Sequence, residues 1–322
     1  MTVETKIRHA EAKLFETARL HADEQFLHLR RTGVRVRVLS FGSGQPVLLL
    51  HGVTEVAVFW TPLIGALHGF RLHAVDLPGH GLSGPVAYRR GMVRDHSLQL
   101  VDDLYEAMKL GPTPVIGHSL GGMFALWHAA ARPGNIASLV AIGSPAVAIP
   151  GSIVRMPLSL LTVPVIGPAV LGIPSPRGAY RGLLQRGDGG ATARVAPDSL
   201  LDVLRFAARR PGNARTAVAL LHAINTFRRP RPESVLSASE LARVSAPTAF
   251  VWGVDDPYLS PGDARPWIEK MPAATLHEVT AGHSPWFDEP VGSATLITRH
   301  LTAAGYPPID GASAPSSQRS AR

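Results

Sequence analysis

The sequence contains no cysteine among its 322 residues. This absence excludes a disulfide framework, a cysteine-ligated zinc site and a thiol nucleophile. An apolar run able to span a membrane is missing as well. The stretch that comes nearest to one, 156–174, is uncharged, but its four prolines would break a spanning helix. The first residues carry charges and no apolar run typical of a signal peptide. We therefore expect a soluble, cytoplasmic protein without a membrane span.

Lysine is absent from the middle of the chain, where positive charge is nevertheless concentrated. Residues 146–240 contain twelve arginines and five acidic residues, which accounts for most of the net charge of +8. A solvated helical face explains this excess, and steering of an anionic substrate is the alternative. No aromatic residues alternate with the basic ones, so nucleic acid is not an expected partner. The 14 histidines form no metal-binding motif, and we expect no metal and no cofactor.

Strand-like and helix-like patterns alternate along most of the chain. Continuous apolar runs such as 46–50 and 137–142 predict strands covered on both faces, as in a parallel sheet. Right-handed crossovers between such strands give an α/β fold with a doubly wound, mostly parallel sheet. The alternation stops between residues 146 and 241, which are rich in proline and glycine and then helical. We interpret this stretch as a helical lid or cap inserted over one edge of the sheet.

The predicted organisation has five parts. They are an N-terminal amphipathic helix in 1–25, the first part of the core in 26–145, the lid in 146–241, the second part of the core in 242–305 and a disordered tail in 306–322. The N-terminal helix packs either on the core or on a second subunit, which leaves a homodimer open. Residues 26–41 predict a hairpin in which Val34 and Val38 alternate with Arg35 and Arg37, so that one face is buried and the other is solvent-exposed.

One tight turn carries the strongest chemical signal. A buried strand ending at Ile116 runs into a helix that starts near Ser119, and the pattern G-x-S-x-G lies between them, from Gly117 to Gly121. The residues two before and two after the serine must be small because the turn is so tight. Such a turn lifts the Ser119 hydroxyl above the sheet. It also points the backbone N–H of Leu120 toward the place where an oxyanion would form.

A serine nucleophile needs a base, and the base needs an acid that orients it. Residue types for both roles follow two later strands. Asp255 and Asp256 come after the strand 247–252, and His283 comes after the strand 275–279. Because the carboxyl ends of parallel strands meet at one edge of a sheet, we expect these residues to lie at the edge that also carries the serine turn.

These motifs, in this order, resemble the α/β-hydrolase family in its large group of lidded serine hydrolases. The resemblance covers about residues 30–303. It rests on His51-Gly52, Asp76-x-Pro78-Gly79-x-Gly81-x-Ser83, Gly117-His118-Ser119-Leu120-Gly121, Gly253-x-x-Asp256 and Gly282-His283. It implies that Ser119 is the nucleophile, that His283 is the general base and that Asp256 orients it, with Asp255 as the alternative acid.

The resemblance also implies roles for the residues around this triad. The backbone N–H groups of Val53 and Leu120 would form the oxyanion hole. His51 and Asp76 are expected to be structural rather than catalytic, and His80 and His118 are expected to be hydrogen-bonded. The aromatic residues beside the motifs are expected to serve packing: Phe59, Trp60 and Trp286.

The resulting hypothesis is an enzyme that cleaves a carboxylic ester through Ser119 and an acyl-enzyme. The uncharged stretch 156–174 favours an apolar acyl or aromatic small-molecule substrate. Hydrolysis of a C–C bond in a ring-fission dienoate, or perhydrolysis, would use the same triad, and an arginine-rich lid would suit such an anionic dienoate. A ligand-binding relative without turnover is a third hypothesis, against which the intact triad argues.

Overall fold

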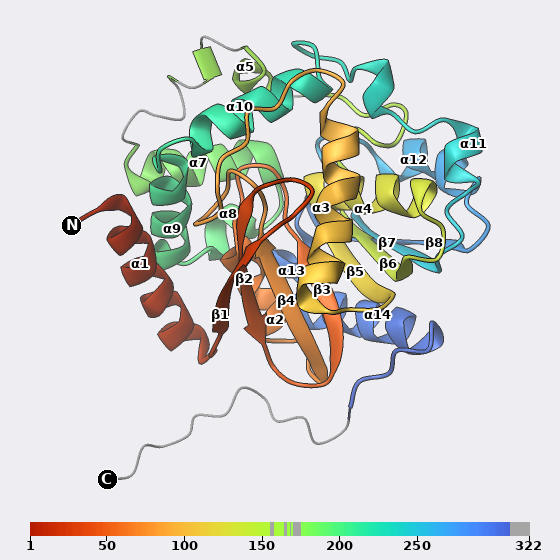
Figure 1. The fold of residues 1–322 in the computed structure, drawn as a ribbon, viewed down its shortest axis with the longest axis horizontal. Helices are drawn as coiled ribbons and strands as arrows, with labels where there is room; N and C mark the ends of the chain where they lie inside the picture. Colours follow the sequence, from red (N-terminus) through yellow and green to blue (C-terminus); the bar gives the residue numbers. More distant parts are fainter. Residues whose placement is uncertain (155–157, 164–165, 168, 170–174, 310–322) are drawn as a thin grey trace.

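An eight-stranded β-sheet runs through the centre of the chain, with helices on both of its faces (Figure 1). The structure is a computed structural model that describes residues 1–154, 158–163, 166–167, 169 and 175–309. The strands are β1 (Asp23–His28), β2 (Arg35–Phe41), β3 (Gln45–Leu50), β4 (Phe70–Asp76), β5 (Thr113–His118), β6 (Ile136–Ile142), β7 (Thr248–Gly253) and β8 (Ala274–Val279). They lie in the order β1-β2-β4-β3-β5-β6-β7-β8. Only β1/β2 and β2/β4 pair antiparallel, and this confirms the predicted α/β fold with a mostly parallel, doubly wound sheet.

Two layers of helices cover the sheet, and its central strands are buried on both sides. In β3, Leu48 and Leu50 face one apolar layer while Val47 and Leu49 face the other. The first layer includes α3 (Val93–Met108), α4 (Leu120–Ala131) and α12 (Pro261–Ile268). The second includes α1 (Val3–Ala18), η1 (Ala57–Trp60), α2 (Thr61–Ile64), α13 (Pro285–Asp288) and α14 (Pro290–Ala303). The continuous apolar strand patterns arise from this double coverage.

The hairpin β1–β2 departs from the predicted alternation. Arg35 is exposed as expected, but the expectation of a solvent-exposed Arg37 was wrong, because this side chain is buried at 2% exposure. The guanidinium of Arg37 donates to both carboxylate oxygens of Glu11 in α1, at 2.7 and 2.8 Å. It also lies 2.6 Å from Glu24 and 3.4 Å from Asp76. Strand β2 is thus covered on its second face by α1, and carboxylates compensate the buried charge.

The N-terminal helix α1 packs within its own chain. Its apolar side chains Ile7, Ala10 and Leu14 are buried, and the helix lies against α9 (Asp198–Ala208), as Figure 1 shows at the left of the view. The apolar face of α1, for which the sequence also allowed a partner subunit, is therefore occupied inside this chain.

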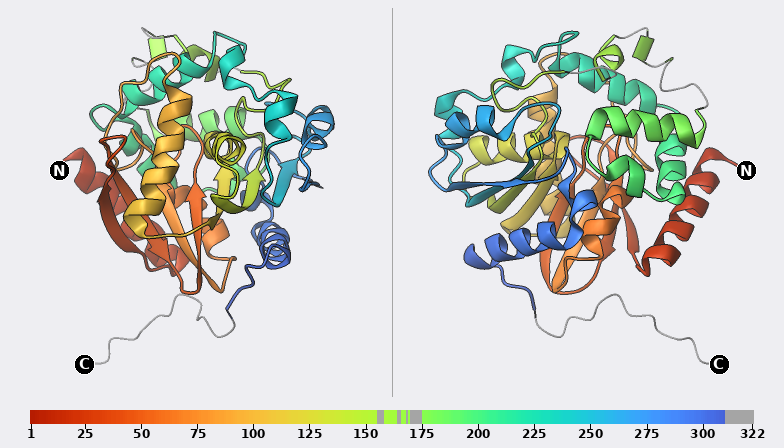
Figure 2. Two further views of the ribbon diagram at one scale, coloured as in Figure 1. Left: turned by 45° about the vertical axis from the view of Figure 1, so that its right-hand side comes forward. Right: turned by 180° about the vertical axis from the view of Figure 1, so that it is seen from behind.

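The residues between β6 and β7, called the insertion from here on, are helical wherever they form regular elements in the described part. The elements are α5 (Leu158–Leu161), α7 (Arg177–Asp188), α8 (Thr192–Val195), α9, α10 (Asn213–Ile224), η2 (Pro232–Ser234) and α11 (Ala238–Leu241). Most of them gather at one end of the sheet, whereas α11 packs against α4 and α12 (Figure 2). The helical second part predicted for residues 146–241 is interrupted between α9 and α10, because Pro211 cannot continue a helix and Gly212 has a φ of 92°.

Some predictions fall on residues that lie outside the described part of the chain. They are the tail from residue 310 onward and much of the uncharged stretch 156–174. Within the described ranges, the helices are all too short or too polar to cross a lipid bilayer.

Candidate active site

Ser119 lies at the sharp turn between β5 and α4 and has a φ of 48°, which is unusual for a residue with a side chain. The flanking glycines explain why the turn can form. A Cβ on Gly117 would lie 2.6 Å from the backbone nitrogen of Gly122, and one on Gly121 would lie 2.0 Å from the carbonyl oxygen of Leu50. Neither position has room for a side chain. The G-x-S-x-G spacing is therefore a requirement of backbone packing at this turn.

His283 lies in the loop after β8, and its Nδ1 is 2.7 Å from Oδ2 of Asp256. The same Asp256 oxygen accepts a hydrogen bond from the backbone N–H of Ser144 at 2.8 Å, and Oδ1 accepts one from the N–H of Tyr258 at 3.0 Å. Asp256 and His283 are buried, whereas Asp255, the alternative acid, is exposed. The structure therefore pairs His283 with Asp256 rather than with Asp255.

The two members of this pair have pKa values shifted in opposite directions. Burial raises the pKa of Asp256, but the charge and hydrogen bond of His283 outweigh burial, and the net shift is downward. Burial lowers the pKa of His283, but nearby carboxylates outweigh it, first Asp256 and then Asp188 and Glu55, so that the net shift is upward. Asp256 thus stays ionised, and the field around His283 favours its protonated form.

The loop after β3 carries Val53, which lines the same pocket as Leu120. His51 shapes this loop: it is fully buried, and its Nε2 accepts a hydrogen bond from the N–H of Leu77 at 3.0 Å. Burial also lowers the pKa of His51 well below its ordinary value, which keeps the ring neutral and able to accept. His51 is thus hydrogen-bonded within this region, and its structural role stays a prediction.

His118 joins this loop to the loop of His283. Its Nδ1 lies 3.0 Å from Oε2 of Glu55, and its Nε2 lies 3.1 Å from the carbonyl oxygen of His283. Glu55 also accepts a hydrogen bond from the N–H of Gly52 at 2.6 Å. The expectation that His118 is hydrogen-bonded is confirmed.

Asp76 and three aromatic residues also have the structural environments that the sequence predicted. Asp76 accepts hydrogen bonds from the N–H groups of Ala57 and Leu82, at 2.7 and 2.9 Å, and so fixes the two loops it joins. The side chains of Phe59, Trp60 and Trp286 are buried against one another.

Three residues of the site were missed by the sequence analysis. Glu55 lies four residues after His51 in a motif loop, and Tyr258 lies two residues after Asp256, so proximity to the motifs was an available signal for both. Asp188 lies in the insertion, far from any motif in the sequence, and no pattern points to it.

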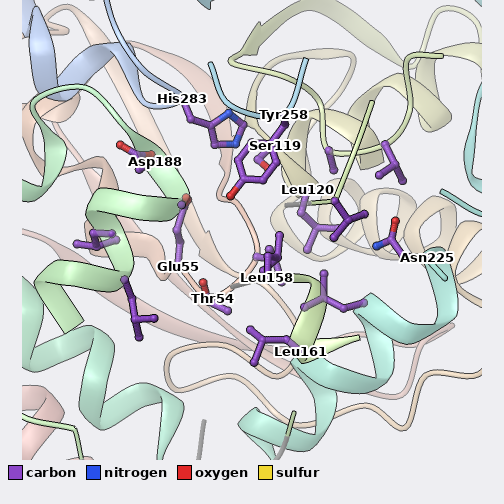
Figure 3. Close-up of a pocket in the computed structure, with 18 of the residues that line it drawn as sticks. Thr54, Glu55, Ser119, Leu120, Leu158, Leu161, Asp188, Asn225, Tyr258 and His283 are labelled. Carbon is purple, nitrogen blue, oxygen red and sulfur yellow. The ribbon is translucent and has the colours of Figure 1, made fainter. Parts of the chain in front are cut away.

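Ser119 and His283 line one pocket, whose space together with the open solvent at its mouth is about 1150 Å³. Figure 3 shows Ser119, Tyr258 and His283 clustered on one side of this pocket, with Leu158 and Leu161 on the other. Apolar side chains make up most of the wall, and the insertion contributes many of them: Leu158, Leu161, Tyr180, Leu183, Leu184, Leu204, Leu221 and Ile224. The wall therefore suits an apolar group bound beside the serine.

The charged side chains of the described pocket wall are acidic apart from His283. They are Glu55 and Asp188, and no arginine or lysine of the described residues lines the pocket. Arginines of the insertion instead form ion pairs elsewhere, such as Arg181 with Asp198 at 3.0 Å and Arg205 with Asp202 at 2.7 Å. The arginine excess thus lies largely outside the pocket. Within the described ranges, histidine and acidic side chains form no group of three or more that could hold a metal ion.

The sequence is similar to those of known proteins. The sequence model of the alpha/beta hydrolase family matches residues 47–295. Over 124 residues the chain is 38% identical to lipase LipV of Mycobacterium tuberculosis, which covers 38% of this chain and 46% of that protein. Over 110 residues it is 38% identical to a pimeloyl-[acyl-carrier protein] methyl ester esterase of Nitrosospira multiformis. This match covers 33% of this chain and 41% of that protein. The chain thus spans less than half the length of these two relatives.

The fold of this chain is also similar to the folds of solved structures. Carboxylesterase CesB (YbfK) of Bacillus subtilis superposes with a TM-score of 0.75 at 16% identity, covering 94% of this chain and 99% of that one.

Proposed function

Because this chain belongs to the α/β-hydrolase family, we propose that it is a serine hydrolase that cleaves carboxylic esters. The observation that carries the proposal is the placement of three side chains. Ser119 lies on a strained turn in the same pocket as His283, and His283 is hydrogen-bonded through Nδ1 to the buried Asp256. This leaves Nε2 of His283 as the ring atom available to act on the serine.

The proposed reaction passes through an acyl-enzyme. Nε2 of His283 takes the proton from Ser119 Oγ as this oxygen attacks the ester carbonyl, and Asp256 holds the ring and stabilises the imidazolium. The backbone N–H groups of Val53 and Leu120 bind the oxyanion, and each is worth about 3 kcal/mol of transition-state stabilisation. His283 then protonates the leaving alcohol, and a water molecule, activated by the same ring, releases the acid.

The proposed substrate is a small-molecule ester with an apolar acyl or aromatic group. Support comes from the apolar wall of the pocket and from the names of the lipase and esterase to which the chain is similar. We further propose that residues 146–241 of the insertion act as a lid over this pocket. A cytoplasmic location and a homodimer stay predictions.

Hydrolysis of a C–C bond or perhydrolysis by the same residues is the alternative. A buried anionic dienoate is stabilised by a cation, and the charged side chains of the described wall are two carboxylates and His283. Ester hydrolysis is therefore the better supported reaction.

The test is active-site labelling with a fluorophosphonate, which reacts with activated serines. We expect a single adduct at Ser119, located by mass spectrometry, and at least a hundredfold slower labelling in Asp256→Asn and His283→Ala. Asp255→Asn is the matched control, because it removes the exposed neighbouring carboxylate and should label at the wild-type rate. Full esterase activity in Ser119→Ala would refute the mechanism.

A further inference from the structure

The end of α7, within the insertion, is bonded directly to the loop that carries His283. The backbone N–H of His283 donates to the carbonyl oxygen of Asp188 at 2.7 Å. The two segments approach so closely that a Cβ on Gly282 would lie 2.5 Å from that same carbonyl oxygen. A Cβ on Gly190 would lie 2.7 Å from the nitrogen of Gly282. The insertion therefore fixes the backbone of the histidine loop.

The side chain of Asp188 is buried beside His283. It is 5% exposed, it lines the pocket together with His283, and the hydroxyl of the buried Ser284 donates to its Oδ1. A buried carboxylate with so few donors is costly unless a positive charge lies near it. The positive charge that acts most strongly on Asp188 is that of His283, and His118 acts less strongly.

We propose that Asp188 is a positioning residue through which the insertion controls His283. Its carbonyl oxygen holds the histidine loop, and its carboxylate stabilises the imidazolium that forms when His283 takes the proton from Ser119. The proposal rests on the proposed function, because it assigns a role in the same reaction. It makes the insertion a part of the catalytic centre as well as a wall of the pocket.

The electrostatic surroundings agree with this role. Burial raises the pKa of Asp188 to about 6, against the opposing influence of His283, Ser284, Thr192 and His118. His283 is faced in turn by the carboxylates of Asp256, Asp188 and Glu55, and by the rings of His118 and Tyr258. Asp188 is thus ionised above a pH of about 6 and adds a second negative charge near the imidazole. Its removal must lower the pKa of His283.

The pH dependence of fluorophosphonate labelling tests this role without knowledge of the substrate. Asp188→Asn keeps the shape and the backbone carbonyl but removes the charge. We expect labelling of Ser119 to be several-fold slower at its plateau, and the acid limb of the rate profile to move to lower pH by about half a unit or more. Asp255→Asn, the matched control, should change neither quantity. A slower Asp188→Asn with an unmoved acid limb would reduce Asp188 to a structural residue and overturn the proposal.

A second variant keeps the proposal testable if Asp188→Asn does not fold. Ser284→Ala removes a hydrogen bond that favours ionised Asp188, so the acid limb of the labelling profile should move to lower pH, while the rate at pH 9 stays close to that of the wild type. Rates that parallel the wild type at every pH would contradict the proposal. Absence of labelling in the wild-type protein would instead reject the proposed function itself, so the two failures are distinguishable.

Discussion

At the scale of single residues, the candidate site depends on positions where no side chain fits. Ser119 has a positive φ of 48° because it is the single residue between the end of β5 at His118 and the start of α4 at Leu120. Gly121 lies against the carbonyl of Leu50, and its N–H donates to the carbonyl of His51 at 3.1 Å. Gly121 therefore connects the serine turn to the loop that carries Val53.

Replacement of Gly121 by alanine should destabilise this connection. The new Cβ would lie 2.0 Å from the backbone oxygen of Leu50, which no side-chain rotation can move. Either strand β3 or the serine turn must therefore shift. We expect a loss of about 1–3 kcal/mol in the free energy of unfolding, measured by chemical denaturation, and strongly reduced labelling of Ser119. Gly111→Ala is the matched control, because a Cβ at Gly111 would have no neighbour within 4 Å. Equal stability of the two variants would contradict this interpretation.

The sequence predicted the residues of the site that follow strands in recognisable motifs. Ser119, Asp256 and His283 each lie just past a strand, and parallel strands bring such positions together whatever the loops do. Asp188 was not predictable in this way. It reaches His283 only through the packing of α7 against the histidine loop, which depends on tertiary contacts of a segment without motifs.

At the scale of elements, helix α1 and strand β2 are joined by a buried charge cluster. Arg37 of β2 meets Glu11 of α1, and Asp76 at the end of β4 lies 3.4 Å away. Since Asp76 also holds the loops at Ala57 and Leu82, docking of α1 is connected to the edge of the sheet that carries the site.

We expect Arg37→Met to loosen α1. The substitution leaves buried carboxylates without their cation, which costs about 3–5 kcal/mol when one partner of a buried pair is removed. Hydrogen exchange should increase in residues 3–18 more than elsewhere, and the melting temperature should fall. Arg35→Met is the control, since Arg35 is the exposed arginine of the same strand. Unchanged exchange in α1 would show that its apolar face alone holds the helix.

Strands were predictable where a continuous apolar run marks a segment that is covered on both faces of the sheet. The apolar runs of β3, β5 and β7 predicted strands at nearly their observed bounds. The burial of Arg37 was not predictable, because alternation along β2 indicates which residues share a face but not that a distant helix covers the second face.

At the scale of the whole molecule, charge is separated between surface and pocket. The net charge is +8, yet the described pocket wall carries two carboxylates and no arginine or lysine. An anionic acyl group would therefore be placed beside like charges in an apolar site.

A pair of matched esters tests this separation. We expect p-nitrophenyl hexanoate to be cleaved with a kcat/KM at least tenfold above that of the mono-p-nitrophenyl ester of adipic acid, which has the same acyl length and one added carboxylate. The ratio should persist at high salt, because Asp188 is buried and the side chain of Glu55 is only 12% exposed. A preference for the anionic ester would indicate a cation in the pocket and would favour the C–C hydrolase alternative.

Buried histidines make the stability of the whole molecule sensitive to acid. Burial lowers the pKa of His51, His73, His80, His96 and His128. A histidine with a folded pKa below its unfolded value of 6.5 contributes stability above that pH and loses it as the pH falls toward the folded value. His283 acts in the opposite sense, since its raised pKa contributes stability below pH 6.5 that is lost as the pH rises through the folded value. The raised pKa of Asp188, about 6, acts in the same sense as that of His283. The five buried histidines outnumber these two groups, so we expect the free energy of unfolding to fall from pH 7 to pH 5.

His73 is the position at which this expectation can be measured. Burial lowers its pKa to about 4, and its Nδ1 lies 2.8 Å from the hydroxyl of Ser40. A difference of about 2.5 units from the unfolded state corresponds to about 3 kcal/mol, lost between pH 6.5 and pH 4. Urea denaturation at several pH values should therefore give a flatter pH dependence for His73→Gln, and the exposed His9→Gln should keep the wild-type slope. If both variants keep that slope, protonation of His73 does not drive acid unfolding, and the loss comes from other groups, such as the remaining buried histidines or the paired carboxylates of Asp103 and Asp256.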